Sequence, residues 1–297
     1  MFFILVFTAI LSISSITLNL ITGVMDRKEI KKKEKVGIIE IKGVILDSKT
    51  VAAQLKKFRE DDSIKAIVLR VESPGGAVGP SQEIYMETRR TREVKPVIAS
   101  MGAIAASGGY YVSAAADGIV ANPGTITGSI GVIMELTNFR ELFEKIGIYS
   151  DVIKSGKYKD IGSPLRPISA EEEALLQQFV ESVHRQFVSD VAIGRNMPEA
   201  DVMKMADGMI FSGEYAKHAG LVDRLGNLQD AVEWAGRKGG IKEDIMTVYP
   251  PEEKYSLLRK ILEMTALEME SIFYRIHSGT VRGGYLYNPS AGAGASR

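Results

Sequence analysis

The sequence contains no cysteine, which excludes disulfide bonds, thiolate metal sites and a cysteine nucleophile. Histidine is almost as scarce: only His184, His218 and His277 occur, and none has a partner at the spacing of a metal site. Basic and acidic residues number 37 each, so no net charge attracts nucleic acid. The glycine-rich segments also lack the lysine-containing motif of a phosphate-binding loop. We therefore expect no metal, no nucleotide cofactor and no nucleic-acid partner.

One long segment contains no charged side chain. Residues 2–25 are mostly apolar, and as a helix they would span about 36 Å, more than the roughly 30 Å of a bilayer's hydrocarbon core. This predicts a single membrane anchor at 2–25; a cleaved signal peptide is the alternative, but its basic start and small-residue cleavage site are missing. The charged linker 26–35 carries six basic residues, and by the positive-inside rule it would hold the rest of the chain in the cytoplasm.

From residue 36 onward, short apolar segments alternate with segments of helical periodicity. The predicted strands are Val36–Ile41, Ala66–Val71, Pro96–Ser100, Gly118–Ala121, Ile130–Met134 and Tyr149–Ile153. Such alternation indicates βαβ units and a mainly parallel sheet. From Ser169 the pattern is mostly helical, beginning with a capping box formed with Glu172. We expect a folded domain at 36–250, a C-terminal helix at 251–276 and a flexible tail at 277–297.

The segment from Ser100 to Tyr111 consists almost wholly of residues with little or no side chain. Its central hydroxyl, Ser107, is followed by two glycines. Small neighbours let another backbone approach this hydroxyl, and N–H groups at the start of a helix can face a reacting carbonyl. The pattern favours a nucleophile at a strand-to-helix turn. The alternative is a small-residue helix start that only packs tightly against a neighbour.

A base for Ser107 is not evident from its sequence neighbours. The three histidines fall in predicted helices or near the predicted tail, which argues against a Ser–His–Asp triad. The nucleophile-elbow pattern is broken by Ala105, and no serine has a lysine three residues later. A lysine from elsewhere remains, and one polar loop offers Lys154, Lys157 and Lys159.

Five short motifs extend this observation. They are Ser73-Pro74-Gly75-Gly76, Ala106-Ser107-Gly108-Gly109-Tyr110-Tyr111, Gly128-Ser129-Ile130-Gly131-Val132, Ser155-Gly156-x-x-Lys159-Asp160 and Ala216-x-x-x-Gly220-Leu221-Val222-Asp223-x-x-Gly226. In this order, across about residues 36–240, the set resembles the SppA signal peptide peptidases.

The resemblance implies an α/β fold of the ClpP/crotonase-like type, a parallel βαβ superhelix. It assigns Ser107 as the nucleophile, Lys159 as the general base and Ser129 as the serine that orients the lysine. It also implies an oxyanion hole made by the backbone N–H groups of Gly76 and Gly108. A lysine acts as a base only when neutral, which requires desolvation to lower its pKa from about 10.4.

The carboxylate of Asp160 would oppose this role of Lys159, because a close negative charge stabilises the ammonium form. We therefore expect the Asp160 side chain to point away from Lys159. The single copy of each motif resembles the short form of the family. The resemblance then implies a ring of identical subunits, in which Ser107 and Lys159 can come from neighbouring copies.

The expected function is that of a membrane-anchored serine endopeptidase that degrades cleaved signal peptides and other unfolded apolar segments. The basic linker predicts a cytoplasmic catalytic domain, whereas the family resemblance implies one outside the cytoplasmic membrane; we expect a single-pass membrane protein in the orientation that the family implies. Three alternatives stay open at this point: a related membrane-bound protease that cuts membrane-protein tails, a crotonase-type acyl-thioester enzyme, and an inactive scaffold.

Overall fold

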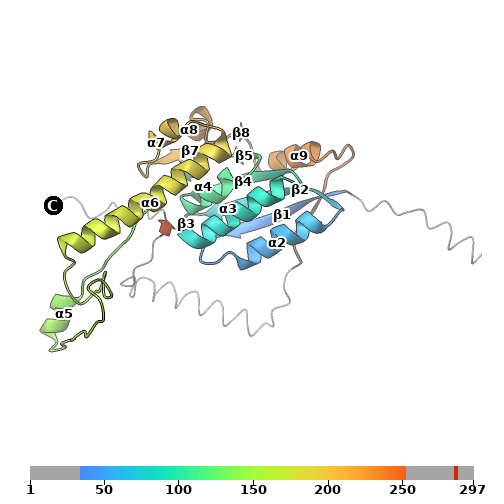
Figure 1. The fold of residues 1–297 in the computed structure, drawn as a ribbon. Helices are drawn as coiled ribbons and strands as arrows, with labels where there is room; N and C mark the ends of the chain where they lie inside the picture. The colour runs from blue at the N-terminus through green and yellow to red at the C-terminus, as the bar shows by residue number, and fades with distance from the viewer. Residues whose placement is uncertain (1–33, 252–283, 287–297) are drawn as a thin grey trace, which may run out of the picture. The chain divides into compact units, whose positions relative to one another are not determined.

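The computed structural model describes residues 34–251 and 284–286, and there the chain forms a largely parallel sheet flanked by helices (Figure 1). The main sheet has the order β7-β6-β4-β2-β1-β9, with β5 and β8 joined at β4. The strands are β1 (Lys35–Lys42), β2 (Ile64–Ser73), β3 (Gly75–Ala77), β4 (Val97–Ala106), β5 (Gly118–Ala121), β6 (Ile126–Gly128), β7 (Ile210–Ser212), β8 (Arg224–Leu225), β9 (Met246–Val248) and β10 (Gly284–Leu286). The predicted mixed α/β fold with a parallel sheet is confirmed.

The helices cover both faces of this sheet. They are α2 (Lys49–Glu60), α3 (Val78–Arg92), α4 (Gly108–Ala114), α5 (Arg140–Lys145), α6 (Ala170–Arg195), α7 (Glu199–Met203), α8 (Gly213–His218) and α9 (Leu228–Lys238). In β1, Ile39 and Ile41 belong to the core under α2, α3 and α4, whereas Val36 and Ile38 belong to the core under α9. Burial on both faces explains why the parallel strands read as continuous apolar runs.

The central strand β4 is continuous up to Ala106, but its pairing with the neighbouring strands changes before it reaches Ser107. Its first half pairs with β5 and its second half with β6, and its register with β2 shifts on passing Glu72. The Glu72 carboxylate accepts the backbone N–H groups of Ala103 at 2.9 Å and Ile104 at 3.2 Å. A Cβ atom on Gly102 would lie 1.6 Å from Glu72 Oε2, so a larger residue here would displace the Glu72 carboxylate from these N–H groups. The carboxylate therefore takes over the ladder hydrogen bonds that the irregularity leaves open.

Two of the predicted strands are wrong. Ile130–Met134 is not a strand; the strand at this place is β6, and the chain leaves the sheet through Gly128 and Ser129 with φ angles of 75° and 51°. Tyr149–Ile153 has no regular structure and its side chains are exposed, with Tyr149 at 81%. An apolar run alone does not distinguish a strand inside a sheet from an apolar surface segment.

Several other predictions fall outside the described residues. These include the anchor at 2–25, nearly all of the linker 26–35, and the helix at 251–276 apart from its first residue. Three residues of the predicted tail form β10, and the remainder of the tail is not described. Within residues 34–251 and 284–286, no helix combines the length and apolar character needed to cross a membrane.

Candidate active site

Ser107 occupies the turn between β4 and α4 in a strained backbone conformation. Its φ and ψ angles are 53° and −118°, a combination that costs a non-glycine residue about 1–3 kcal/mol. The turn is fixed on both sides: the Ser107 N–H donates to the Gly128 carbonyl at 2.8 Å, and its own carbonyl accepts the Tyr111 N–H at 2.8 Å. The residue is only 1% exposed. Strain of this kind, held by neighbouring structure, is typical of a nucleophile at a strand-to-helix turn.

Ser129 lies beside this turn. The strands β4 and β6 are parallel, and Ala106 is paired with Gly128. Ser107 and Ser129 are therefore the next residues beyond the ends of two adjacent strands, which are about 4.8 Å apart. Ser129 is also buried and has a positive φ, and its N–H donates to the Met209 carbonyl at 2.7 Å. The structure thus brings these two predicted site residues together.

The predicted oxyanion-hole glycines also lie side by side. A Cβ atom at Gly108 would be 3.1 Å from the backbone nitrogen of Gly76 and 2.8 Å from Ser81 Oγ. A Cβ atom at Gly76 would lie 2.1 Å from the Ile45 carbonyl oxygen. Gly108 is the first residue of α4, so its N–H has no acceptor within the helix. Neither position has room for a side chain, and both backbones border the Ser107 turn.

Strand β3, which contains Gly76, has a partner on each edge. On one edge Ile45 forms a parallel bridge with Gly76. On the other, β10 pairs antiparallel with β3, placing Tyr285 opposite Gly76. An edge that binds an extended segment beside the nucleophile turn is the arrangement by which a protease aligns a peptide backbone.

Lys159 lies in the loop before α6, away from Ser107. Tyr111, one turn after Ser107, packs against Phe187 of α6 with ring centroids 4.9 Å apart. The lysine loop contacts the other end of α6, where Tyr158 hydrogen-bonds to Glu171. Sixteen residues separate Phe187 from Glu171, about 24 Å of helix. Figure 1 shows the same separation, with α5 and this loop beyond the N-terminal end of α6. The described chain therefore does not bring Lys159 to Ser107.

The three candidate lysines differ in their partners. Lys154 Nζ binds Asp160 at 2.5 Å, and Lys157 Nζ pairs with Glu171. For Lys159, the residues that the structure describes provide no side-chain partner. As expected, the Asp160 carboxylate does not contact Lys159. Arg166 and Lys154 bind it instead and hold its pKa well below the usual range.

Some residues around the site escaped the sequence analysis. Glu72 binds the irregular part of β4. Nothing in the sequence marked it for this role, because it stands near the end of β2, an ordinary predicted strand. Arg166, which binds Asp160 and Glu172, lies three residues before the N-cap Ser169. The capping box was predicted and is confirmed. The arginine that precedes it in the sequence was the available sign of an ion pair with the capping glutamate.

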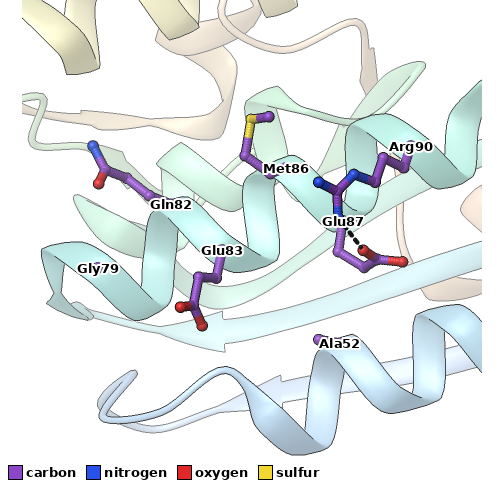
Figure 2. A pocket seen from close by; sticks show the side chains of 7 residues that line it. All are labelled: Ala52, Gly79, Gln82, Glu83, Met86, Glu87 and Arg90. Atoms are coloured by element: carbon purple, nitrogen blue, oxygen red, sulfur yellow. Dashed lines mark hydrogen bonds and ion pairs between the residues drawn. The ribbon is translucent and has the colours of Figure 1, made fainter.

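A surface groove lies elsewhere, between α2 and α3 (Figure 2). Its carboxylates are already partnered: Glu83 accepts a hydrogen bond from Ser48, and Glu87 pairs with Arg59 and, at 3.2 Å, with Arg90. None of the predicted site residues lines this groove. It offers no nucleophile–base arrangement.

The parallel α/β fold and the buried, strained serine define a serine hydrolase of the ClpP-like type. In agreement, residues 28–124 match the Clp protease family. Residues 89–242, just over half of the chain, match peptidase family S49. The chain belongs to peptidase family S49 and is a serine protease of the SppA type.

Known relatives agree with this assignment. The chain is 43% identical to a candidate protease of Synechocystis sp. over 77% of its own length and 83% of the relative's. It is 44% identical to a candidate signal peptide peptidase SppA of Enterococcus faecium over 61% of the chain and 53% of the relative. It is 35% identical to the chloroplastic serine protease SPPA of Arabidopsis thaliana over 69% of the chain and 30% of the relative. The chain thus spans most of the first relative and about half or less of the other two.

Proposed function

We propose that this protease is an endopeptidase in which Ser107 is the nucleophile and Lys159, from a neighbouring copy of the chain, is the general base. The observation that carries the proposal is the buried Ser107, held in a strained turn between Ser129 and the two adjoining glycines, Gly76 and Gly108. The active site would then be complete only in an assembly of identical chains.

The chemistry follows from this arrangement. Neutral Lys159 takes the hydroxyl proton while Ser107 Oγ attacks the scissile carbonyl, and the resulting oxyanion accepts the N–H groups of Gly76 and Gly108. Each such donor is worth roughly 3–4 kcal/mol of transition-state stabilisation. Lys159 then protonates the leaving amine, and water hydrolyses the acyl-enzyme in the same way. The Ser129 hydroxyl binds the lysine amine without adding a charge that would favour the ammonium form.

The partners of the loop lysines support Lys159 as the base. Lys154 and Lys157 are already bound to the carboxylates of Asp160 and Glu171, and the bond to Glu171 raises the pKa of Lys157. Lys159 is exposed in a single chain, so it needs another surface to desolvate it. Exposed apolar side chains in the same region, including Ile146, Tyr149 and Ile153, offer such a surface to a neighbouring copy.

Two inactive variants test the shared dyad. Ser107→Ala and Lys159→Ala are each expected to lose at least 1,000-fold in kcat/KM on an apolar fluorogenic peptide. If neighbouring chains complete each site, an equal mixture of dissociated and reassembled variants regains about a quarter of the wild-type activity, because one in four pairings joins the intact residues. Activity in Lys159→Ala alone would refute the dyad. A mixture without activity would refute the sharing.

The substrate class rests on the same site and on the relatives' names. The edge of β3 supports binding of peptides in an extended conformation, and one relative is named as a signal peptide peptidase. We therefore propose cleaved signal peptides and other unfolded apolar segments as substrates, with small or apolar side chains before the scissile bond. Peptides differing only at that residue test this, since preferred cleavage after charged residues would contradict it.

Membrane anchoring by residues 2–25, with the catalytic domain outside the cytoplasm, is part of the proposal. Its support is the uncharged segment and the location where released signal peptides accumulate. The basic linker argues for the opposite orientation. Protease treatment of intact spheroplasts that carry a C-terminally tagged chain decides between them, because only an external domain loses the tag.

A further inference from the structure

The loop that carries Lys159 is attached to the protein mainly by charged contacts with the first turn of α6. Residues 151–159 are all exposed, so apolar packing does not hold them. Two consecutive carboxylates of α6 bind the loop on both sides of the lysine. Glu171 binds Lys157 and Tyr158, and Glu172 binds Arg166, which in turn binds Asp160. Lys159 lies between these two attachment points.

Arg166 is the centre of the second attachment. Its guanidinium binds both oxygens of Asp160, at 2.8 and 3.0 Å, and both oxygens of Glu172, at 2.5 and 2.8 Å. It also donates to the Asp160 carbonyl at 3.2 Å. Glu172 is 4% exposed and also forms the capping box with Ser169. A planar guanidinium bound to two carboxylates fixes both position and orientation, which a lysine at this place would not do.

These contacts have an electrostatic consequence for the base. The carboxylate of Asp160 belongs to the residue directly after Lys159, and Arg166 and Lys154 occupy both of its oxygens. Lys154 also donates to the Lys157 carbonyl at 3.0 Å, and the Lys159 N–H donates to the Gly156 carbonyl at 3.1 Å, which closes the turn at Lys159. If Asp160 were released, its charge would be free to approach the ammonium group of Lys159 and favour protonation.

We propose that Arg166 is a positioning residue for the catalytic base: it fixes the turn that presents Lys159 and keeps the Asp160 carboxylate away from the lysine amine. This inference rests on the proposed function, because it assumes that Lys159 is the base. Glu172 supports Arg166 from α6, and Lys154 donates to Asp160 Oδ1, which also accepts from Arg166. In this arrangement the hydrogen bonds from Arg166 lower the pKa values of both Asp160 and Glu172.

Two ion pairs involve the other charged groups on the elements that flank this loop, whereas Asp151 in the loop and Glu141 on α5 have no ion pair within the described residues. From α6, Glu171 pairs with Lys157; from α5, Arg140 pairs with Glu144 at 2.7 Å. The α5 segment meets the loop through a backbone hydrogen bond between the Phe139 N–H and the Pro164 carbonyl, at 2.7 Å. The carboxylate most directly placed to change the protonation of Lys159 is thus that of Asp160.

The test is the pH dependence of kcat/KM for the full-length chain on the apolar peptide. Because the base must be neutral, activity falls below the pKa of Lys159. The acidic limb of the profile is this fall in kcat/KM at low pH. Arg166→Gln is expected to raise the midpoint of the acidic limb by about one pH unit and to lower kcat about 10-fold, with little change in KM. Adding Asp160→Asn to Arg166→Gln is expected to return the limb to the wild-type position. Arg140→Gln, which breaks an exposed pair on α5, is the matched control and leaves the limb unchanged.

A second variant separates charge from folding. Lys154→Gln removes one hydrogen-bond donor to Asp160 and leaves the contacts with α6 intact. It is expected to shift the acidic limb in the same direction as Arg166→Gln, by a smaller amount. Thermal denaturation checks that each variant is folded. The inference is overturned if Arg166→Gln lowers activity without moving the limb, or if Asp160→Asn does not reverse the shift. Activity that persists in Lys159→Ala would instead contradict the proposed function, so the two failures are distinct.

Discussion

The two halves of the proposed active site are built in opposite ways. Ser107 is buried, its backbone is hydrogen-bonded on both sides, and glycines around it leave no space for other side chains. The loop of Lys159 is exposed, has no apolar core, and is held by ion pairs to α6. The nucleophile half is therefore ordered by packing within one chain. The base half is ordered by charge, and in the proposed assembly another copy of the chain covers it.

This difference separates the consequences of mutation. In the packed half, a single added methyl group has nowhere to go, and stability and activity fall together. In the charged half, the loop has no apolar core of its own, so loss of its ion pairs releases the loop and changes activity while the rest of the chain stays folded. The predictions below test this contrast.

The largest effect is expected from Gly76→Ala. The new Cβ atom would lie 2.1 Å from the Ile45 carbonyl oxygen, so β3 must move away from Ser107. We expect a loss of 100-fold or more in kcat and destabilisation by about 1–3 kcal/mol, measured by denaturant unfolding. Gly79→Ala is the control, because nothing lies within 4 Å of the position of its Cβ atom. Normal activity in Gly76→Ala would show that β3 is not part of the site.

The next effect concerns the exposed apolar side chains of the base half. Ile153 is fully exposed in the single chain, and burial of such a side chain in an assembly contributes about 1.5–3 kcal/mol. Ile153→Asp is expected to shift the assembly toward smaller species in sedimentation velocity and to reduce activity at least 10-fold, with an unchanged melting temperature. Met86→Asp, in the groove between α2 and α3, is the matched control (Figure 2). Equal effects of both substitutions would contradict an interface at Ile153.

A moderate effect is expected from Glu72→Ala in the packed half. The substitution leaves the N–H groups of Ala103 and Ile104, four and three residues before the nucleophile, without their carboxylate acceptor. We expect a loss of about 1–2 kcal/mol in stability and a several-fold fall in kcat with KM nearly constant. Glu40→Ala removes an exposed carboxylate of β1 that pairs with Lys42 and serves as the control. A change in KM alone would mean that Glu72 affects peptide binding instead.

The packed half was also the more predictable one. Strands β1, β2 and β5 follow from apolar runs, and the small residues around Ser107 correctly indicated a close approach of backbones. The sequence did not reveal the shift in register between β4 and β2 at Glu72. The hydrogen bonds from the Glu72 side chain that accompany this shift are made to another strand, and a local pattern does not show them. For the base half, the polar composition predicted the loop but not the ion pairs.

The failed prediction of a strand at Tyr149–Ile153 has the same origin. Apolar residues usually indicate burial within a chain, whereas here they are exposed on a segment without a core of its own. The sequence motif singled out Lys159 from Lys154 and Lys157, and the structure adds a physical reason, since those two are bound to carboxylates. In the proposed assembly the lysine comes from a neighbouring chain, and a pattern within one chain does not encode that directly.

The smallest expected effect is a loosening of the base half in acid. Arg166 lowers the Glu172 pKa from 4.5 to about 2 and also lowers that of Asp160. A lowered carboxylate pKa means stabilisation that is present above the unfolded value and is lost as the pH falls through the folded value. Between pH 4.5 and 2, the amides of Ile161 and Ser163 should therefore lose hydrogen-exchange protection, after correction for intrinsic rates. The Ser107 amide, bound to the Gly128 carbonyl, should keep its protection in this range because no carboxylate holds it. Simultaneous loss of protection in both regions would mean that the two halves unfold as one unit, and that charge alone does not hold the loop.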